Sequence, residues 1–345
     1  MLEHDELCLL TEINDAMPEE RLNIEVFSMG AYSNPTQSGD YLRSVIPKGK
    51  FYPELYGVAM QCDKDNLHPE LVDWADVIIM MHNSAIPGQK EQQRWLVRNW
   101  QLLRPKSKRV IWRSIGQSTP AIEEELGRYR ALGLKIVRYS PIEDQIPKYA
   151  GSDAMIRFAK DENIFMGWTG QRKHIITFAQ SFKKRGDHLG FPLFERVTAG
   201  FQRKVFGTEN EDLGSLSGGL RSYAEMVRDI QEARVYWYFG TQPAPYTLSF
   251  IEAMMTGVPV VAVGPKLRAT VSAYNWKNYE VPDIITNGVN GFVADTEQEL
   301  KTYIQNLLTD DELANRISVA GRKTAVELFG QKQRMREWAD FLRRL

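Results

Sequence analysis

The chain has 345 residues, of which 43% are hydrophobic and 25% are charged, and its formal net charge is −1. This composition fits a soluble globular protein with room for two domains, and the near-neutral charge excludes a general attraction to nucleic acid. Cys8 and Cys62 form no C-x-x-C pair, which argues against a zinc site or a disulfide framework. Without a membrane-spanning apolar stretch or a signal-peptide core, we expect a cytoplasmic protein with no transmembrane segment.

After residues 1–22, an extension with no assigned role, the first half of the chain alternates predicted strands and helices. Strands are predicted at residues 23–30, 75–83, 109–114 and 134–140, and helices at residues 40–46, 91–103 and 121–133. The strands carry apolar runs, and the helices have apolar residues three and four positions apart. This alternation predicts a parallel sheet with helices on both faces.

A second alternating series follows a linker expected around Tyr149–Met155. Strands are predicted at residues 163–168, 194–200 and 233–240, and helices at residues 173–186 and 220–233. Near the C-terminus, a stripe of apolar residues at helical spacing predicts an amphipathic helix; it comprises Met335, Trp338, Leu342 and Leu345.

The segment from Tyr246 to Gly264, YTLSFIEAMMTGVPVVAVG, predicts a loop, a short helix and a buried strand. Ser249 and Glu252 have the spacing of a capping box, and Gly257 suits the left-handed position that ends a helix. The apolar run after it is typical of a buried parallel strand. A helix that begins just after the strand at 233–240 presents free N–H groups and a positive dipole end, which predicts an anion site.

This segment, together with VPDIITNGVNGFVADTEQEL at residues 281–300, resembles the donor-binding region of retaining nucleotide-sugar glycosyltransferases of the GT-B fold, family 4. The resemblance implies an α/β protein with two Rossmann-like domains facing across a cleft. Residues 1–155 would form the acceptor side and residues 156–330 the nucleotide-sugar side. A C-terminal helix, residues 331–345, would pack back toward the N-terminal domain.

The same resemblance implies the chemistry. A sugar would move from a nucleoside-diphosphate sugar to an acceptor with retention of configuration, without a cofactor and without an essential metal. The acceptor would be a saccharide, a lipid-linked molecule, another small molecule or, as a weaker expectation, DNA.

Several site residues follow from the resemblance. Glu252 would accept hydrogen bonds from the ribose hydroxyls, since a carboxylate can take both. The backbone N–H groups of Thr247, Leu248 and Ser249 would bind the diphosphate. Lys173 and Arg172, expected in a loop between a strand and a helix, would be the catalytic cations that stabilise the leaving diphosphate.

Further positions complete the expected site. Gly39, in a turn after the first strand, would let backbone approach a phosphate or sugar closely. Gly167 matches the glycine of a Gly-Arg pair in the family and would also lie at the donor. His82 ends the strand predicted at 75–83, and Gln117 follows the strand predicted at 109–114. Both would lie at the edge where α/β sheets place their sites, and both are possible cleft residues.

Two positions depart from the family pattern. Ala244 stands where the family has a carboxylate that contacts the sugar, and Ile115 stands where it has a cleft histidine. Ala244 would still face the donor.

Three other interpretations stay open. The chain could be a GT-B nucleotide-binding protein without turnover, or a GT-B enzyme that glycosylates modified DNA bases. The basic clusters Arg104–Arg109 and Lys183–Arg185 lend slight support to the second, although such short runs usually are solvated helix ends or turns. Asp63 and Asp65 form a D-x-D pair that could bind a metal, but their neighbours are typical turn residues, which favours a loop.

Overall fold

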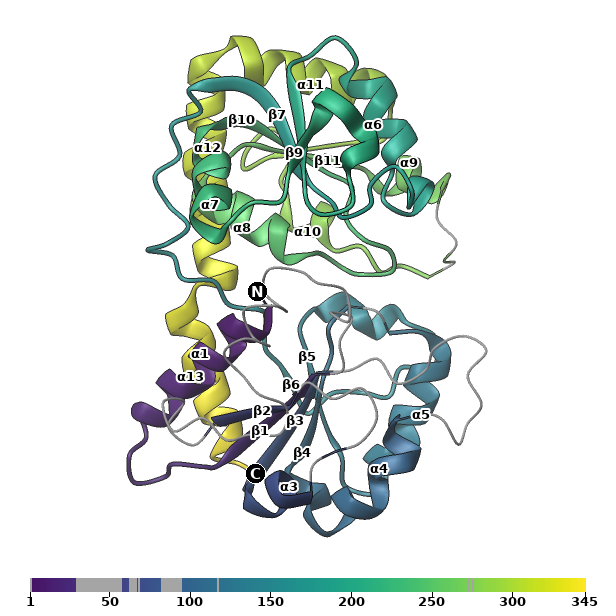
Figure 1. Cartoon of the computed structure of the whole chain (residues 1–345). Helices are drawn as coiled ribbons and strands as arrows, with labels where there is room; N and C mark the ends of the chain where they lie inside the picture. The colour runs from purple at the N-terminus through teal and green to yellow at the C-terminus, as the bar shows by residue number, and fades with distance from the viewer. Residues whose placement is uncertain are drawn as a thin grey trace. The chain divides into compact units, whose positions relative to one another are not determined.

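The chain forms two compact units in the computed structural model (Figure 1). The structure describes residues 2–28, 58–61, 67, 69–81, 95–116, 118–271, 274 and 276–345. Unit 1 comprises Met1–Ala159, Trp276–Asn278 and Gln331–Leu345; unit 2 comprises Lys160–Asn275 and Tyr279–Gly330.

A parallel sheet of six strands forms the centre of unit 1, in the order β2-β1-β3-β4-β5-β6. The strands are β1 Ile24–Ser28, β2 Val58–Gln61, β3 Val77–Met81, β4 Val110–Arg113, β5 Lys135–Arg138 and β6 Ala154–Met155. Every residue of β3 and β4 is buried, as expected where helices cover both faces of a sheet.

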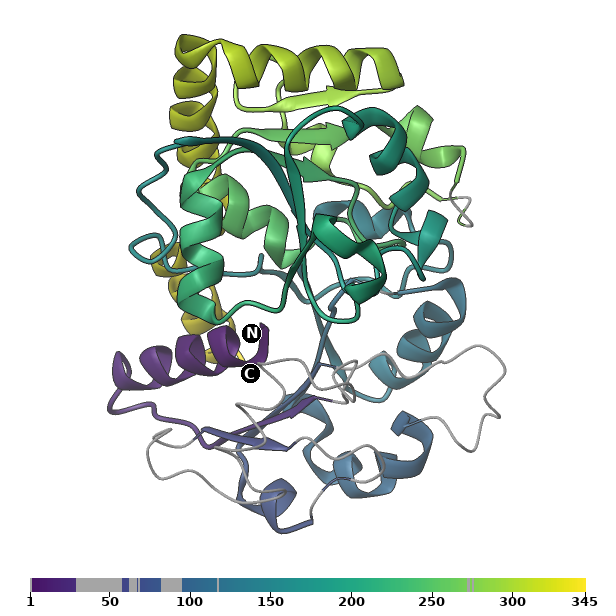
Figure 2. The same ribbon diagram turned by 45° about the horizontal axis from the view of Figure 1, so that its top comes forward.

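The helices of unit 1 cover the two faces of this sheet (Figures 1 and 2). They are α1 Leu2–Asp15, α3 Pro69–Trp74, α4 Trp95–Leu103, η3 Arg104–Arg109, α5 Pro120–Arg130, η4 Pro141–Gln145 and α13 Gln331–Leu342. The main apolar core lies between the sheet and α3, α4 and α5, and includes Trp100, Trp112 and Leu126. The C-terminal α13 packs against α1, with Trp338 fully buried.

Unit 2 repeats this architecture with a second parallel sheet, in the order β12-β11-β10-β7-β8-β9. The strands are β7 Arg172–Phe178, β8 Arg203–Phe206, β9 Ser217–Gly219, β10 Ala233–Tyr238, β11 Val260–Val263 and β12 Phe292–Ala294. The helices are η5 Gly186–His188, α6 Phe191–Thr198, η6 Glu211–Leu216, α7 Tyr223–Glu232, α8 Leu248–Thr256, α9 Pro265–Ala269, α10 Val281–Ile284, α11 Glu297–Thr309 and α12 Asp311–Phe329.

The two faces of the second sheet have different partners. On one face α6 and α11 pack against β7, β10 and β11 in a core that includes Phe194, Trp237 and Ile304. On the other side, α8 packs against α12, as Figure 1 shows. This leaves the carboxyl edge of the central strands next to the N-terminal turn of α8.

The predicted α/β class with two parallel sheets is confirmed, but three elements at the start of unit 2 are wrong. Residues 163–168 form the end of a turn and an irregular loop, residues 172–178 form β7 instead of a helix, and residues 191–198 form α6 instead of a strand. Ile175 and Ile176 are stiff β-branched residues that suit the sheet centre. Leu193, Phe194 and Val197 have helical spacing, and all three are buried.

Two smaller expectations also need correction. The expected linker at residues 149–155 contains β6, the edge strand of the first sheet. The N-cap of α8 is Thr247, so the predicted capping box between Ser249 and Glu252 does not form. The helix end was predicted correctly, since Gly257 is its C-cap with φ of 100°.

Glu25 on β1 makes the stability of unit 1 depend on pH. The carboxyl group is fully buried, has no hydrogen-bond partner among the described residues, and burial raises its pKa from 4.5 to about 8. Folded Glu25 therefore keeps a proton that the unfolded chain releases above pH 4.5. The free energy of unfolding should fall between about pH 4.5 and 8, by about 1.4 kcal/mol per pH unit from this group.

We predict that Glu25→Gln removes this slope. Chemical unfolding at several pH values should show the variant gaining stability over wild type as the pH rises toward 8, with little difference near pH 4.5. Parallel pH profiles for the two proteins would contradict the assignment.

Candidate functional site

The strand order of the second sheet reverses between its two central strands. From β7 the chain continues outward through β8 and β9, then returns to β10 on the other side and continues through β11 and β12. Val235 and Tyr236 of β10 pair with Ile175 and Ile176 of β7, so the two strands end side by side. In sheets of this kind, the crevice outside the carboxyl ends at such a reversal is the usual ligand site.

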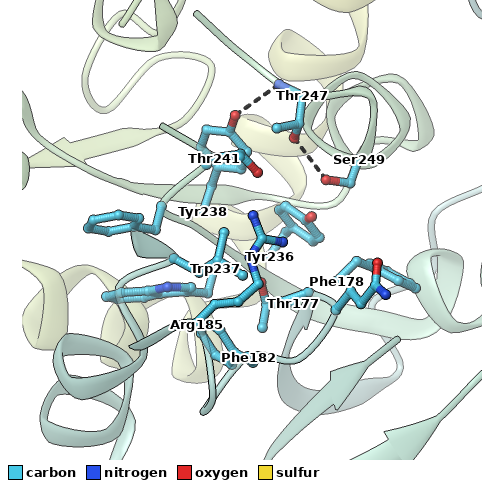
Figure 3. Close-up of a pocket in the computed structure, with 15 residues that line it drawn as sticks. Thr177, Phe178, Phe182, Arg185, Tyr236, Trp237, Tyr238, Thr241, Thr247 and Ser249 are labelled. Atoms are coloured by element: carbon cyan, nitrogen blue, oxygen red, sulfur yellow. Dashed lines mark hydrogen bonds between the residues drawn. The ribbon is translucent and has the colours of Figure 1, made fainter. Parts of the chain in front are cut away.

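A cavity of about 150 Å³ lies at this point (Figure 3). Three segments form its walls: the end of β7 with the loop after it, the end of β10 with the loop after it, and the start of α8. Its lining residues are Thr177–Gln180, Phe182, Arg185, Leu189, Tyr236–Thr241, Thr247 and Ser249.

The N-terminus of α8 supplies hydrogen-bond donors to one side of the cavity. Thr247 has extended backbone, and its N–H donates to the Tyr238 hydroxyl at 3.0 Å. The hydroxyls of Thr247 and Ser249 lie 2.9 Å apart. Among the described residues, the N–H groups of Leu248 and Ser249 meet no acceptor. Free N–H groups at the positive end of a helix favour an anion.

Two buried tyrosines form the floor beneath this helix turn. Burial raises the pKa of Tyr238 to about 12, and it raises that of Tyr236 further, while a hydrogen bond with Ser249 acts in the opposite direction. Both phenols therefore stay protonated at neutral pH. They hold the hydroxyls of Thr247 and Ser249 in place without adding negative charge to the cavity.

Arg185 brings a positive charge to the cavity. Figure 3 shows its guanidinium pointing into the space between the lining side chains. It forms no ion pair with any residue that the structure describes, and partial burial lowers its pKa. A guanidinium nevertheless remains charged at neutral pH. Such a cation together with a helix N-terminus makes a site that suits a phosphate group.

Comparisons with solved structures identify the architecture. The Anabaena protein Alr3699/HepE in complex with UDP-glucose is 13% identical with a TM-score of 0.64, over 94% of this chain and 100% of that one. Sucrose-phosphate synthase from Thermosynechococcus elongatus is 12% identical with a TM-score of 0.63, over 96% of this chain and 91% of that one.

The chain has the GT-B fold. An alpha-glucosyltransferase in complex with UDP-glucose and DNA containing an abasic site is also similar, with 12% identity and a TM-score of 0.58, over 93% of this chain and 99% of that one. No family model matches the chain, and no curated protein sequence does either.

Within this GT-B chain, the structure brings part of the predicted site together. Thr247 and Ser249 line the cavity, and Leu248 lies between them in the first turn of α8. Glu252 lies one turn further along, where its buried carboxylate is 2.8 Å from Lys160 Nζ. It does not line the cavity, so its contact with ribose stays a prediction.

The placement predicted for Lys173 and Arg172 is wrong. Both lie at the amino end of β7, opposite the carboxyl ends that form the cavity. Lys173 contacts Asp311 at 2.5 Å, and Arg172 contacts Glu232 at 2.8 Å. Gly167, with φ of 80°, lies in the irregular loop before this strand and does not line the cavity. The error arose because the first strand of unit 2 was expected one element too early.

The remaining predicted residues divide into two groups. Ala244 is buried in the turn between β10 and α8, where its N–H donates to the Thr241 carbonyl at 2.9 Å. Its neighbour Gln242 is also buried, and the Gln242 amide nitrogen has no partner among the described residues. Gly39, His82, Gln117, Asp63 and Asp65 lie outside the described residues.

The sequence interpretation missed Arg185. It belongs to the basic cluster Lys183–Arg185, for which the sequence predicts a solvated helix end or turn. A correct placement of β7 would have revealed it, because the cluster then falls in the loop after the first strand of the unit. That loop forms part of the cavity wall in this GT-B chain.

The described part of the chain shows no group of three or more histidine, cysteine, aspartate or glutamate side chains that could hold a metal ion. Within the same residues, no helix is both long enough and apolar enough to cross a membrane.

We predict that Arg185→Met weakens the binding of inorganic pyrophosphate about ten-fold or more, since a hydrogen bond to a charged group contributes about 1.5–3 kcal/mol. Isothermal titration calorimetry measures the effect. Lys173→Met is the matched control, because it removes one lysine at the opposite edge and should leave pyrophosphate binding unchanged. Equal affinities for wild type and Arg185→Met, or a loss confined to Lys173→Met, would show that the anion binds elsewhere.

Proposed function

We propose that this protein is a glycosyltransferase that moves a sugar from a nucleoside-diphosphate sugar to an acceptor with retention of configuration. The observation that carries the proposal is Arg185, which has no ion-pair partner in the described chain and lies beside the N-terminus of α8, in a cavity at the strand reversal of a GT-B unit. Two of the similar structures, HepE and the alpha-glucosyltransferase, are complexes with UDP-glucose. This supports a nucleoside-diphosphate sugar as the donor of this protein.

The cavity's charges match the needs of the reaction. The bond between the sugar's anomeric carbon and the diphosphate oxygen breaks, and the acceptor oxygen forms a new bond to that carbon. The diphosphate leaves with one more negative charge, and the proton of the acceptor hydroxyl passes to an oxygen of the leaving diphosphate or to solvent. Arg185 and the N–H groups of Leu248 and Ser249 would stabilise the charge that develops on the leaving group.

These positive groups would serve in place of a divalent cation, and we propose that the reaction needs no metal and no cofactor. The hydroxyls of Thr247 and Ser249 would add neutral hydrogen bonds to the diphosphate or the sugar. The acceptor would be a saccharide, a lipid-linked molecule or a small molecule, and the protein would work in the cytoplasm.

A thermal-shift screen with UDP-, GDP-, ADP- and dTDP-sugars tests donor binding. A donor at about 100 times its dissociation constant should add about 2.7 kcal/mol to the free energy of unfolding. Hydrolysis of the stabilising donor, with release of the nucleoside diphosphate in EDTA, tests turnover without a divalent metal. Stabilisation without hydrolysis or transfer would favour a nucleotide-binding protein without turnover, and no response to any donor would refute the proposal.

Ala244 gives a prediction about the choice of sugar. An apolar residue at a sugar-facing position discriminates weakly among hydroxyl patterns, whereas a carboxylate rejects sugars that lack the hydroxyl it binds. We predict that wild type tolerates donors that differ at these hydroxyls. Ala244→Glu should either narrow the choice toward common hexoses or abolish activity by burying an unpaired charge.

Transfer or hydrolysis rates over one donor panel test this difference. Ala244→Gln, which adds a similar volume without charge, separates crowding from electrostatics. If the Glu variant keeps both the donor profile and the rates of wild type, residue 244 does not face the sugar.

A further inference from the structure

A second arginine lies directly behind the cavity wall. Arg268 on α9 has only 4% of its surface exposed. Its Nε donates to the Phe239 carbonyl at 3.2 Å, and its Nη2 donates to the Thr241 carbonyl at 3.4 Å. Both carbonyls belong to the loop Phe239–Thr241, which lines the cavity after β10. Arg268 therefore holds the loop Phe239–Thr241, which is one wall of the cavity, at both ends of the loop.

No carboxylate among the described residues pairs with Arg268. Its guanidinium carbon is 4.1 Å from the centre of the Tyr279 ring, a cation–π contact that offsets only part of the lost hydration. Burial lowers its pKa, and the groups that act against this effect are the phenols of Tyr279 and Tyr238. A buried cation without a counter-ion costs free energy, and an anion that binds nearby recovers part of that cost.

Arg268 and Arg185 act on the same region. Besides burial, both arginines lower the pKa of His188, which lies three residues after Arg185. Arg185 reaches into the cavity from the loop after β7, while Arg268 supports the loop after β10. Two guanidiniums without carboxylate partners in the described chain carry a charge of +2 between them. The diphosphate of a nucleotide sugar carries about two negative charges and would balance it.

We infer that Arg268 is a positioning residue of the phosphate site, which holds the loop Phe239–Thr241 and supplies the second positive charge that a bound diphosphate balances. This inference rests on the proposed function, because it takes the cavity as the place of the donor diphosphate. It adds a residue that does not touch the cavity and whose contribution is electrostatic as well as structural.

The competing explanation is purely structural: Arg268 only ties the loop in place. The two explanations differ in whether the loss of affinity caused by removing Arg268 depends on the charge of the ligand. If Arg268 only shapes the wall, its removal weakens uridine, UMP and UDP by the same factor. If its charge matters, the loss grows with each phosphate, since the Coulomb interaction is proportional to the ligand charge.

Calorimetric titration of uridine, UMP and UDP at low salt tests this, with the guanosine or adenosine series used instead if wild type prefers GDP or ADP. Arg268→Gln keeps a donor for the loop but loses the charge, and Arg268→Lys keeps the charge on a different shape. We expect Arg268→Gln to lower UDP affinity on the order of ten-fold, with uridine changed less than about two-fold. Arg268→Lys should preserve the ratio of UDP to uridine affinity even if its loop is looser.

Arg234→Gln is the matched control. Arg234 is another buried arginine of unit 2, but it binds the Leu307 carbonyl and pairs with Asp311 at the amino end of β10. Its loss should not change the UDP-to-uridine ratio. The electrostatic role would be refuted if Arg268→Gln lost affinity for uridine and UDP by the same factor. It would also be refuted if the ratio of UDP to uridine affinity fell as much in Arg234→Gln as in Arg268→Gln. Wild type that binds none of UDP, GDP and ADP would instead refute the proposed function itself.

Discussion

The pairing of β7 with β10 is the interaction on which the candidate site depends. These strands are distant in sequence, and each is also paired on its other side, β7 with β8 and β10 with β11. Their side-by-side carboxyl ends bring together two loops and the first turn of α8, none of which would form a cavity alone. Aromatic residues near the end of β10, Trp237 on one face and Tyr238 on the other, hold the strand against both helical layers.

The cavity combines rigid and adaptable parts. The helix turn at Thr247 is held by Tyr238 and Ser249, and the loop Phe239–Thr241 is held by Arg268. Groups that are already ordered lose little entropy when a ligand binds. Arg185, by contrast, extends from a more exposed turn and forms no ion pair with the residues that the structure describes. Recognition of an anion here would therefore begin on a preformed surface.

The sequence predicted the fold well where local signals agreed with one another. The αL glycine at position 257 and the apolar run after it located α8 and β11, because both features are set by short-range geometry. The start of unit 2 failed because Ile175 and Phe178 also have the spacing of a helix, and only their position in the sheet centre decides between the two. The same failure displaced Lys173 from the site and concealed Arg185. Arg268 could not be found at all, since its role depends on carbonyls 29 and 27 residues away in the chain.

The two arginines differ in their contact with solvent, and this difference has a consequence for ionic strength. Counter-ions gather around an exposed charge such as Arg185 and screen its attraction to a ligand, with a screening length of about 8–10 Å at ordinary salt concentrations. A charge enclosed by protein, such as Arg268 against Tyr279, is shielded much less. In a site built from one exposed and one enclosed arginine, added salt would first lower the affinity for an anionic ligand. The affinity would then reach a plateau, since the enclosed charge continues to act after the exposed one has been screened.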